Sequence, residues 1–374
     1  MVIFDYQRHR LAVLRDLEEA CGRVLRSGVF VLGNETRAIE STLAALVGVE
    51  HGIAVSSGTS AIRLALTSLG IGPGDEVVTA AAGFVGTAEA IHATGATPVF
   101  ADVGHDGLVT PPNVEAVVTH RTKALVCVHL FGSPCQMPAL QELCRRRRIF
   151  LVEDAAQSIL AEYESRPLGA FGDVACFSFF PNKQLGAEAD AGLVLTRSAK
   201  VAEMCRLHRN HGRQAWDDYT LVTHGNCRVS ELAAAVLNAK APHLRQWIEG
   251  RRTAAALYTQ LIESRGLPLR IPHRDRPGYQ GSHYDFVVQC DNRTTRDALK
   301  RFLASSGIET KARYSPCIPN TPAFKALGFG GHFPQAETVG NTFLALPMFN
   351  LISRNEVAEV AEHVARFFSG GSNA

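Results

Sequence analysis

Short apolar segments alternate with amphipathic segments over the first two-thirds of this 374-residue chain, and this alternation limits the folds open to it. A short, continuous apolar run is typical of a strand buried on both faces, whereas the stretches 61–69 and 138–147 have a helical pattern. Alternating strands and helices predict an α/β protein with a doubly wound, mostly parallel sheet. The seven predicted strands are 52–55, 76–79, 97–101, 124–129, 149–152, 174–179 and 192–195.

The pattern changes after residue 229, where longer helices replace the alternation. A chain of this length with 46% hydrophobic residues can bury one large core and a smaller one. We therefore expect a large domain over residues 1–245 and a smaller C-terminal α+β domain over residues 246–374. The elements predicted in this region are helices at 230–240, 244–264 and 294–305 and a strand at 284–289.

Charge and cysteine content exclude several functional classes. The 38 basic and 36 acidic residues leave a net charge of +2, which is too small to indicate a nucleic-acid partner. The one basic cluster, Arg145 to Arg148, directly precedes the apolar run 149–152, and we interpret it as the solvated end of a helix that leads into a strand. Nine cysteines without a Cys-x-x-Cys pair indicate neither a zinc site nor a disulfide framework, so we expect no metal.

The same composition bears on localisation. Charged side chains recur through the first twenty residues, which excludes a secretory hydrophobic region there. The Ala- and Val-rich stretch 77–100 is interrupted by glycine, proline, glutamate and histidine, and we interpret it as strand, helix and strand. An odd number of thiols fits a reducing compartment. We expect a cytoplasmic protein without a membrane partner.

Three polar motifs lie where predicted strands end. Asp154 follows strand 149–152, Lys183 follows strand 174–179, and Ser57-Gly-Thr-Ser-Ala61 joins a strand to the helix that begins near Ala61. In open α/β sheets, ligands bind at the carboxyl ends of the strands. Each motif alone has a simpler reading: a helix cap, a common acidic pair, and a solvent-exposed lysine. Together, and in this order, they predict one ligand site.

The chemistry of these motifs indicates pyridoxal phosphate as the ligand. The glycine and hydroxyl residues at 57–61 leave backbone N–H groups free at a helix N-terminus, which is a seat for phosphate. The amine of Lys183 can condense with the cofactor aldehyde and later move a substrate proton. A carboxylate at Asp154 would keep the pyridine nitrogen protonated, so that the ring can accept electrons. Lys183 and Asp154 are thus the predicted catalytic pair.

These motifs resemble those of the DegT/StrS-type family of pyridoxal-phosphate-dependent sugar aminotransferases, which has the aspartate-aminotransferase-like fold of type I. The most specific segments are the one around Lys183 and the run Glu153-Asp-Ala-Ala-Gln157. The resemblance extends over nearly the whole chain. It covers residues 25–33, 57–61, 95–102, 128–132, 153–157, 177–186, 226–232, 307–316 and 333–348.

The resemblance implies cofactor contacts at several positions. Gly58 and Thr59 would hold the cofactor phosphate together with Ser178, on the strand before the lysine. Phe84 would stack on the pyridine ring; alternatively, it is a core phenylalanine. Gln157 would form a hydrogen bond with the phenolic oxygen of the ring; alternatively, it is a polar residue at a helix start.

The resemblance also implies a shared active site. Asn226 matches a residue that reaches the phosphate bound by the neighbouring subunit, so we expect a homodimer. Arg228 is a further candidate contributor nearby. Tyr314 matches a segment bordering the substrate cleft, although a buried structural tyrosine would be equally ordinary.

The implied reaction is an amino transfer. Glutamate or glutamine would be the donor, and a keto-sugar, nucleotide-linked or free, or a keto-cyclitol would be the acceptor. The setting would be amino-sugar, antibiotic or other natural-product biosynthesis, or surface-glycan biosynthesis. Two alternatives remain: a dehydratase or lyase with the same cofactor, and a regulator that binds the cofactor without turnover. Lys183 counts against a dehydratase or lyase, because the family's sugar dehydratases typically carry histidine at this position. The lack of a fused DNA-binding domain in this sequence counts against a regulator.

Four segments depart from the family pattern. Apolar residues replace a polar pair after Gln157 and a histidine near Tyr314, and two other segments lose an acidic or a glycine-rich pattern. Because sugar hydroxyls need buried polar partners, departures near the cleft would make a standard nucleotide-sugar less secure as the substrate. The segments are Ile159-Leu160, Cys135-Gln136, Ile318 and Glu188-Ala-Asp-Ala-Gly192.

Overall fold

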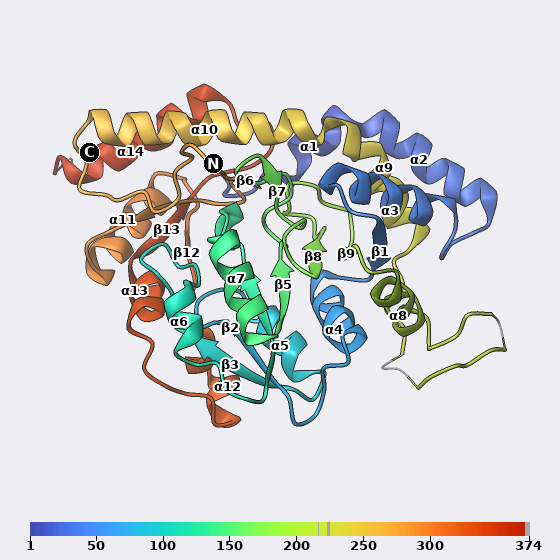
Figure 1. The fold of residues 1–374 in the computed structure, drawn as a ribbon. Helices are drawn as coiled ribbons and strands as arrows, with labels where there is room; N and C mark the ends of the chain where they lie inside the picture. The colour runs from blue at the N-terminus through green and yellow to red at the C-terminus, as the bar shows by residue number, and fades with distance from the viewer. Residues whose placement is uncertain (216, 223–224, 371–374) are drawn as a thin grey trace.

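A seven-stranded sheet forms the centre of the larger part of the protein, as the computed structural model of residues 1–215, 217–222 and 225–370 shows (Figure 1). The strand order is β1-β9-β8-β5-β4-β2-β3, and in this sheet β9 alone runs in the direction opposite to the other six strands. The predicted mostly parallel sheet of an α/β protein is therefore confirmed. The strands are β1 (His51–Val55), β2 (Glu76–Ala80), β3 (Thr97–Ala101), β4 (Thr122–Val128), β5 (Phe150–Asp154), β8 (Val174–Ser178) and β9 (Gly192–Thr196).

All seven predicted strands are present, and their ends differ by no more than two residues. The difference matters at β5, which continues to Asp154, so the carboxylate belongs to the last residue of the strand. The helix predicted from near Ala61 begins earlier, at Gly58, because the hydroxyl of Ser57 accepts a hydrogen bond from the amide of Ser60 (3.1 Å) and caps the first turn.

Helices cover both faces of this sheet, and alternate strand residues point to opposite faces. Val126 of β4 packs in the same cluster as Ile62, whereas the next residue, Cys127, packs with Leu140. Helices α4 and α8 cover the first face; α6 and α7 cover one half of the second face, and α3 and α9 cover the other half. The helices of this part are α3 (Asn34–Val47), α4 (Gly58–Ser68), α5 (Gly86–His92), α6 (Pro111–Glu115), α7 (Met137–Arg147), α8 (Ala199–Arg209) and α9 (Glu231–Lys240).

The basic run at the end of α7 is a solvated helix end, as predicted. Arg145 pairs with Glu142 (2.7 Å) and Arg146 pairs with Glu115 (2.9 Å), both at the surface, and β5 begins at Phe150. Among the described residues, no helix is both long enough and apolar enough to cross a bilayer.

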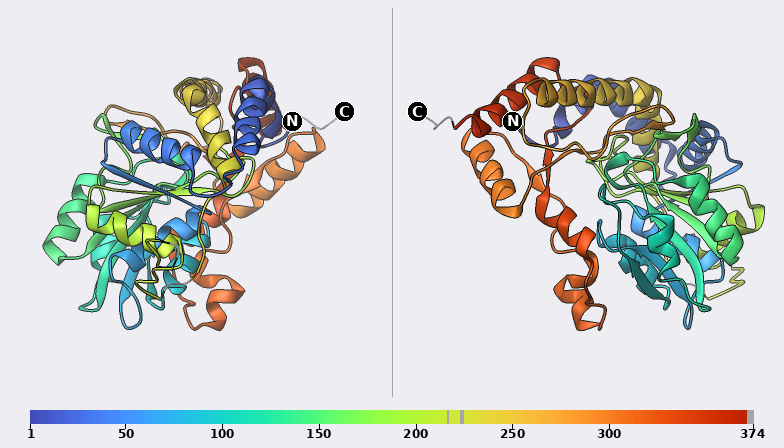
Figure 2. Two further views of the ribbon diagram at one scale, coloured as in Figure 1. Left: turned by 90° about the vertical axis from the view of Figure 1, so that its right-hand side faces the viewer. Right: turned by 60° about the vertical axis from the view of Figure 1, so that its left-hand side comes forward.

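The long helix α10 (Leu244–Ser264) runs along the top of Figure 1, from the end of α9 to the C-terminal part. That part contains a three-stranded antiparallel sheet with the order β11-β13-β12. Figure 2 shows the C-terminal part, in orange and red, beside the larger part. The predicted helix 244–264 is confirmed; the predicted strand 284–289 is shorter. The elements are β11 (Phe286–Gln289), α11 (Arg293–Ser305), β12 (Lys311–Ala312), α12 (Pro322–Ala326), α13 (Pro334–Thr342), β13 (Phe343–Leu346) and α14 (Arg354–Phe368).

The first residues of the chain lie with this C-terminal part. The carbonyl of Met1 accepts a hydrogen bond from the amide of Glu309 (2.9 Å), and that of Ile3 accepts one from Met348 (3.3 Å). The division of the chain near residue 245 stays a prediction, and α10 begins beside it. The remaining elements are α1 (Tyr6–Ala12), α2 (Leu14–Ser27), η1 (Leu130–Gly132), β6 (Glu162–Tyr163), β7 (Arg166–Pro167), η2 (Ala241–His243), β10 (Tyr279–Gln280) and η3 (Ile318–Asn320).

Candidate active site

A cavity of about 420 Å³ lies at the carboxyl ends of β5 and β8, where the sequence predicts the ligand site. Its volume is in the range of small-molecule sites, roughly 300–1,000 Å³. The C-terminal part completes the wall with Tyr284 and Arg313. Eight residues predicted from the sequence line this cavity: Gly58, Thr59, Phe84, Asp154, Gln157, Ser178, Lys183 and Tyr314.

The carboxylate of Asp154 is buried and held by two hydrogen bonds. Its Oδ2 accepts from the hydroxyl of Thr87 (2.6 Å), and its Oδ1 accepts from the amide of Ala156 (3.1 Å). Burial raises the pKa of Asp154, while Thr87, Ala156 and the charge of Lys183 oppose that rise. The carboxylate therefore faces the cavity in a fixed orientation. Sequence reasoning missed Thr87, whose one signal was its place three residues after Phe84.

The side chain of Lys183 is partly buried and reaches the cavity from the turn after β8. The amide of Lys183 donates to the carbonyl of Phe180 (2.8 Å), and its Nζ lies 4.3 Å from the centre of the Tyr284 ring. Desolvation lowers the pKa of Lys183 to about 8, although the nearby Asp154 and Asp285 oppose this shift. At pH 7, about a tenth of this amine is therefore uncharged and nucleophilic, far more than for a lysine with an ordinary pKa.

This lowered pKa predicts how cofactor uptake depends on pH. Because the uncharged amine of Lys183 is the nucleophile, the rate at which the apoprotein takes up added pyridoxal phosphate should rise with pH through a midpoint near 8. Stopped-flow absorbance at a series of pH values measures this rate. A midpoint near the ordinary lysine value of 10.5 would contradict the desolvated environment.

A candidate anion-binding site lies at the other end of the cavity, where α4 begins. Among the described residues, no acceptor receives the amide N–H groups of Gly58 and Thr59, as expected for a first helical turn. A Cβ atom at position 58 would lie 2.8 Å from the Cβ of Ser178, so only glycine allows this close approach. The hydroxyl of Ser178 thus stands beside two free N–H donors, a favourable arrangement for phosphate.

These residues fit pyridoxal phosphate, the cofactor predicted from the sequence. The seat at Gly58, Thr59 and Ser178 suits its phosphate, the buried carboxylate of Asp154 suits a ring nitrogen that carries a proton, and the amine of Lys183 suits its aldehyde. The ring of Phe84 also lines the cavity and is 57% exposed, which is not the burial expected of a core phenylalanine.

Gln157 and Tyr314 form a connected wall of the cavity. The Oε1 of Gln157 accepts from the amide of Phe131 (2.7 Å), and its Nε2 donates to the hydroxyl of Tyr314 (3.2 Å). The rings of Phe131 and Tyr314 are stacked, with centroids 6.0 Å apart. Gln157 lies in the turn after β5, so the alternative reading as a helix-start residue is wrong. The contact of Gln157 with the cofactor stays a prediction.

Asn226 and Arg228 are not brought into the cavity of their own chain. Asn226 is exposed, and its Oδ1 accepts from the amide of Arg228 (2.9 Å). The guanidinium of Arg228 donates to the Oδ1 of Asn210 (3.0 Å). The roles of Asn226 and Arg228 in a neighbouring subunit's site stay predictions.

The fully buried carboxylate of Glu153 stabilises the end of β5. Glu153 accepts hydrogen bonds from the amides of Gly169, Phe171 and Gly172 (2.6–2.8 Å), and it lies 3.1 Å from the Nε2 of His129. Sequence reasoning missed this role, because the acidic pair was read only for Asp154. The cluster ties β5 to the turn at 169–172 and so holds Asp154 in place.

Most of the departures from the family pattern do not border the cavity, and the expectation that all four do is wrong. Ile159, Leu160 and Ile318 are buried in hydrophobic clusters, because the chain turns into the core at these points. Cys135 is also buried, and its thiol donates to the carbonyl of Val128 (3.3 Å). Of the departing residues, Asp190 alone is in the cavity lining given by the described chain.

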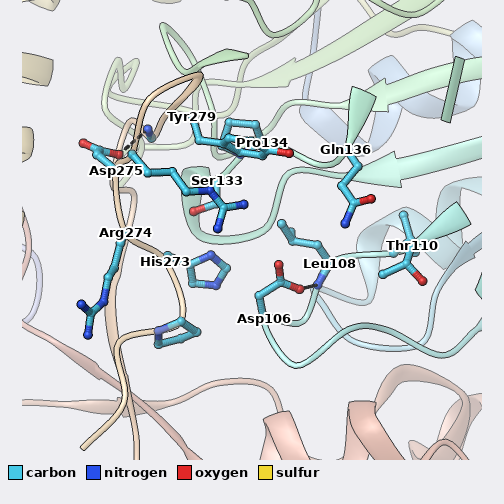
Figure 3. A pocket seen from close by; sticks show the side chains of 14 residues that line it. Asp106, Leu108, Thr110, Ser133, Pro134, Gln136, His273, Arg274, Asp275 and Tyr279 are labelled. Atoms are coloured by element: carbon cyan, nitrogen blue, oxygen red, sulfur yellow. Dashed lines mark hydrogen bonds between the residues drawn. The ribbon is translucent and has the colours of Figure 1, made fainter. Parts of the chain in front are cut away.

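A second, smaller hollow lies between the loop at 272–281 and the segments that carry Asp106 and Ser133 (Figure 3). Its volume is about 50 Å³, too small for a cofactor. The ring of Phe131 meets His273 edge-on (5.3 Å) while stacking on Tyr314, so Phe131 stands between the two spaces. The hollow is therefore separate from the larger cavity.

The chain is similar to known proteins both in sequence and in structure. The profile of the DegT/DnrJ/EryC1/StrS aminotransferase family matches residues 14–365. The chain is 39% identical over 366 residues to UDP-N-acetyl-3-dehydro-alpha-D-glucosamine 3-aminotransferase of Acidithiobacillus ferrooxidans, covering 97% of each chain. It is 37% identical to the pleiotropic regulatory protein of Geobacillus stearothermophilus, covering 97% of this chain and 96% of that one. The solved structure of S. venezuelae DesV matches with a TM-score of 0.93 at 34% identity, covering 98% of this chain and 97% of DesV.

Proposed function

The chain belongs to the DegT/DnrJ/EryC1/StrS aminotransferase family and is a pyridoxal-phosphate-dependent aminotransferase, and on this basis we propose that it transfers an amino group from glutamate or glutamine to a keto-sugar. The observation that carries this proposal is the presence of the Lys183 amine and the buried Asp154 carboxylate in one cavity at the carboxyl end of the sheet. This pair favours turnover over a purely sensory role.

Each of these residues has a distinct task in the proposed reaction. The bound cofactor supplies an aldehyde that takes up the amino group and a ring that accepts electrons. Lys183, uncharged in part at neutral pH, accepts the proton from the α-carbon of the donor and later returns a proton to the carbon that receives the amine. Asp154 keeps a proton on the ring nitrogen. Gly58, Thr59 and Ser178 bind the phosphate.

Polar groups in the same cavity support a sugar as the acceptor. The Nδ2 of Asn182 donates to the hydroxyl of Tyr284 (2.8 Å), and its buried Oδ1 has no hydrogen-bond partner among the described residues. Asp190 adds an exposed carboxylate. Such groups can satisfy sugar hydroxyls that leave water on binding. A relative 39% identical acts, by its name, on a nucleotide-linked keto-sugar, so we propose a role in amino-sugar or natural-product biosynthesis.

A screen of acceptors tests this proposal. The purified holoenzyme is incubated with glutamate and a panel of nucleotide-linked keto-sugars, free keto-sugars and keto-cyclitols, and the products are analysed by mass spectrometry. An aminated sugar is the expected product. Loss of water from a sugar without gain of nitrogen would instead favour the dehydratase alternative.

We further propose that the active unit is a homodimer with shared sites. An exposed apolar segment, defined by Leu25, Val29, Phe30 and Val31 (48–61% exposed), is unusual for a free surface. The carbonyl of Phe30 accepts from the amide of Glu231 (2.9 Å), so this segment lies close to the stretch that carries Asn226. A second copy that covers the segment would lie close to the stretch that carries Asn226, which is what the predicted contact of Asn226 with a neighbouring subunit requires.

Subunit mixing tests the shared site. Lys183→Ala and Asn226→Asp should each be inactive, the second because its carboxylate would repel the bound phosphate by a few kcal/mol, roughly, in a partly buried site. A mixture of the two should regain about a quarter of wild-type activity, because half of the dimers are mixed and each holds one intact site. Sedimentation measures the state of assembly. An active monomer would refute the proposal.

A cytoplasmic location completes the proposal. All nine cysteines are free thiols, and eight of them are buried. Free thiols in this number are typical of proteins kept in a reducing compartment.

A further inference from the structure

Arg313 lies in the wall of the cavity that holds Lys183, directly after β12. Its side chain is 13% exposed, and the carboxylate of Asp285 beneath it is fully buried. The Nε of Arg313 is 3.0 Å from the Oδ2 of Asp285, and its Nη2 is 3.5 Å from the Oδ1. Asp285 therefore balances the charge of the guanidinium and holds it at the edge of the cavity.

This ion pair leaves the hydrogen-bonding capacity of the guanidinium mostly unused. A guanidinium has five N–H donors, whereas Arg313 makes one long hydrogen bond to Asp285 among the described residues. The Nε of Arg313 and the Oδ2 of Asp285 are both buried without an aligned partner. A buried N–H donor or carboxylate acceptor of this kind is costly unless a ligand or water completes its hydrogen bonds.

The charges around the cavity indicate that Arg313 is available to bind an anion. Among the lining residues in the described chain, Arg313 is the one arginine, and the amine of Lys183 is used by the cofactor. The buried carboxylates of Asp154 and Asp285 would repel an entering anion. A carboxylate that enters this space therefore needs the guanidinium, which can bind it through two parallel hydrogen bonds.

We propose that Arg313 binds the α-carboxylate of the amino donor and that Asp285 positions its guanidinium for this task. The inference rests on the proposed function, in which the donor is an α-amino acid. The α-carbon of the donor must come within reach of the Lys183 amine, so its carboxylate, one bond away, lies on the same side of the cavity. Arg313 is on this side, because it lines the same cavity as Lys183 and Tyr284, and its charge acts on the Lys183 amine, where it helps to lower the pKa.

Calorimetric binding of glutarate tests the carboxylate site without turnover. Glutarate carries the two carboxylates of glutamate but no amino group, and 1,5-pentanediol serves as the uncharged probe of the same length. The double variant Arg313→Gln/Asp285→Asn removes both charges and so leaves no buried unpaired carboxylate. Arg313→Lys keeps the charge but not the planar fork. Arg274→Gln, beside the smaller hollow in Figure 3, is the matched control. Absorbance of the bound cofactor verifies that each variant is folded and loaded.

The double variant should bind glutarate about tenfold to a hundredfold more weakly than the wild type, with Arg313→Lys in between and Arg274→Gln unchanged. Undiminished binding in the double variant, or no binding to the wild type, would overturn the proposal.

In the double variant Arg313→Gln/Asp285→Asn, the single-turnover rate with L-alanine, which has only an α-carboxylate, should fall by the same factor as the rate with glutamate. A loss with glutamate alone would assign Arg313 to the distal carboxylate and overturn the inference. Failure of the wild type to convert with any amino acid would instead refute the proposed function, whatever the glutarate result.

Discussion

Replacing Lys183 with alanine is expected to abolish amino transfer while leaving the fold intact. The side chain lies in the cavity and forms no side-chain hydrogen bond with any residue that the structure describes, so its removal costs little stability. The loss of both the covalent attachment and the proton-transferring amine should reduce the single-turnover rate with glutamate by about 10⁴-fold or more. Rapid-mixing absorbance measures the rate, and circular dichroism checks the fold.

Lys300→Ala is the matched control, because this lysine is exposed on α11, in the C-terminal part. It should convert glutamate at the wild-type rate. If Lys183→Ala kept even a few per cent of the wild-type rate, roughly, Lys183 could not be the base that moves the substrate proton.

Asp154→Asn is expected to have the second-largest effect. Asparagine has the same shape and can keep the contacts with Thr87 and Ala156, so the cofactor should remain bound. It cannot stabilise a protonated ring nitrogen, and the single-turnover rate with glutamate should fall by roughly two to three orders of magnitude. Stopped-flow absorbance with saturating glutamate measures this rate.

The control for this variant is a second Asp→Asn change in the same cavity. Asp190 lines the cavity but is exposed, so Asp190→Asn should leave the reaction with glutamate almost unchanged. Equal rates for Asp154→Asn and the wild type would show that another group protonates the ring.

The part of the fold that could be predicted from the sequence is the part encoded by local patterns. The strands of the main sheet are continuous apolar runs because both faces of the sheet are covered, and all seven were recognisable. Asp154 and Lys183 could be placed because each follows such a run at its carboxyl end. The antiparallel insertion of β9 between β1 and β8 has no such local signal, because strand order depends on contacts between distant segments.

The missed residues of the site depend on the same kind of distant contact. Thr87 meets Asp154 across 67 positions of the chain, and Arg313 meets Asp285 across 28. In neither pair do both residues belong to a motif that can be recognised in the sequence.

The departing residues were misplaced for the opposite reason. Ile159 and Leu160 are close in sequence to Gln157, but the chain turns inward after it and buries them. Their apolar character was the better guide to their position.

The central claim, that Lys183 in this cavity carries the cofactor, can be tested directly on the wild-type protein. Borohydride reduction of the holoenzyme fixes the cofactor to its lysine, and peptide mapping by mass spectrometry then locates the phosphopyridoxyl group. We expect the group on the peptide that contains Lys183, at a stoichiometry close to the cofactor content. A label on a different lysine, or none on a protein that visibly binds the cofactor, would contradict this account of the site.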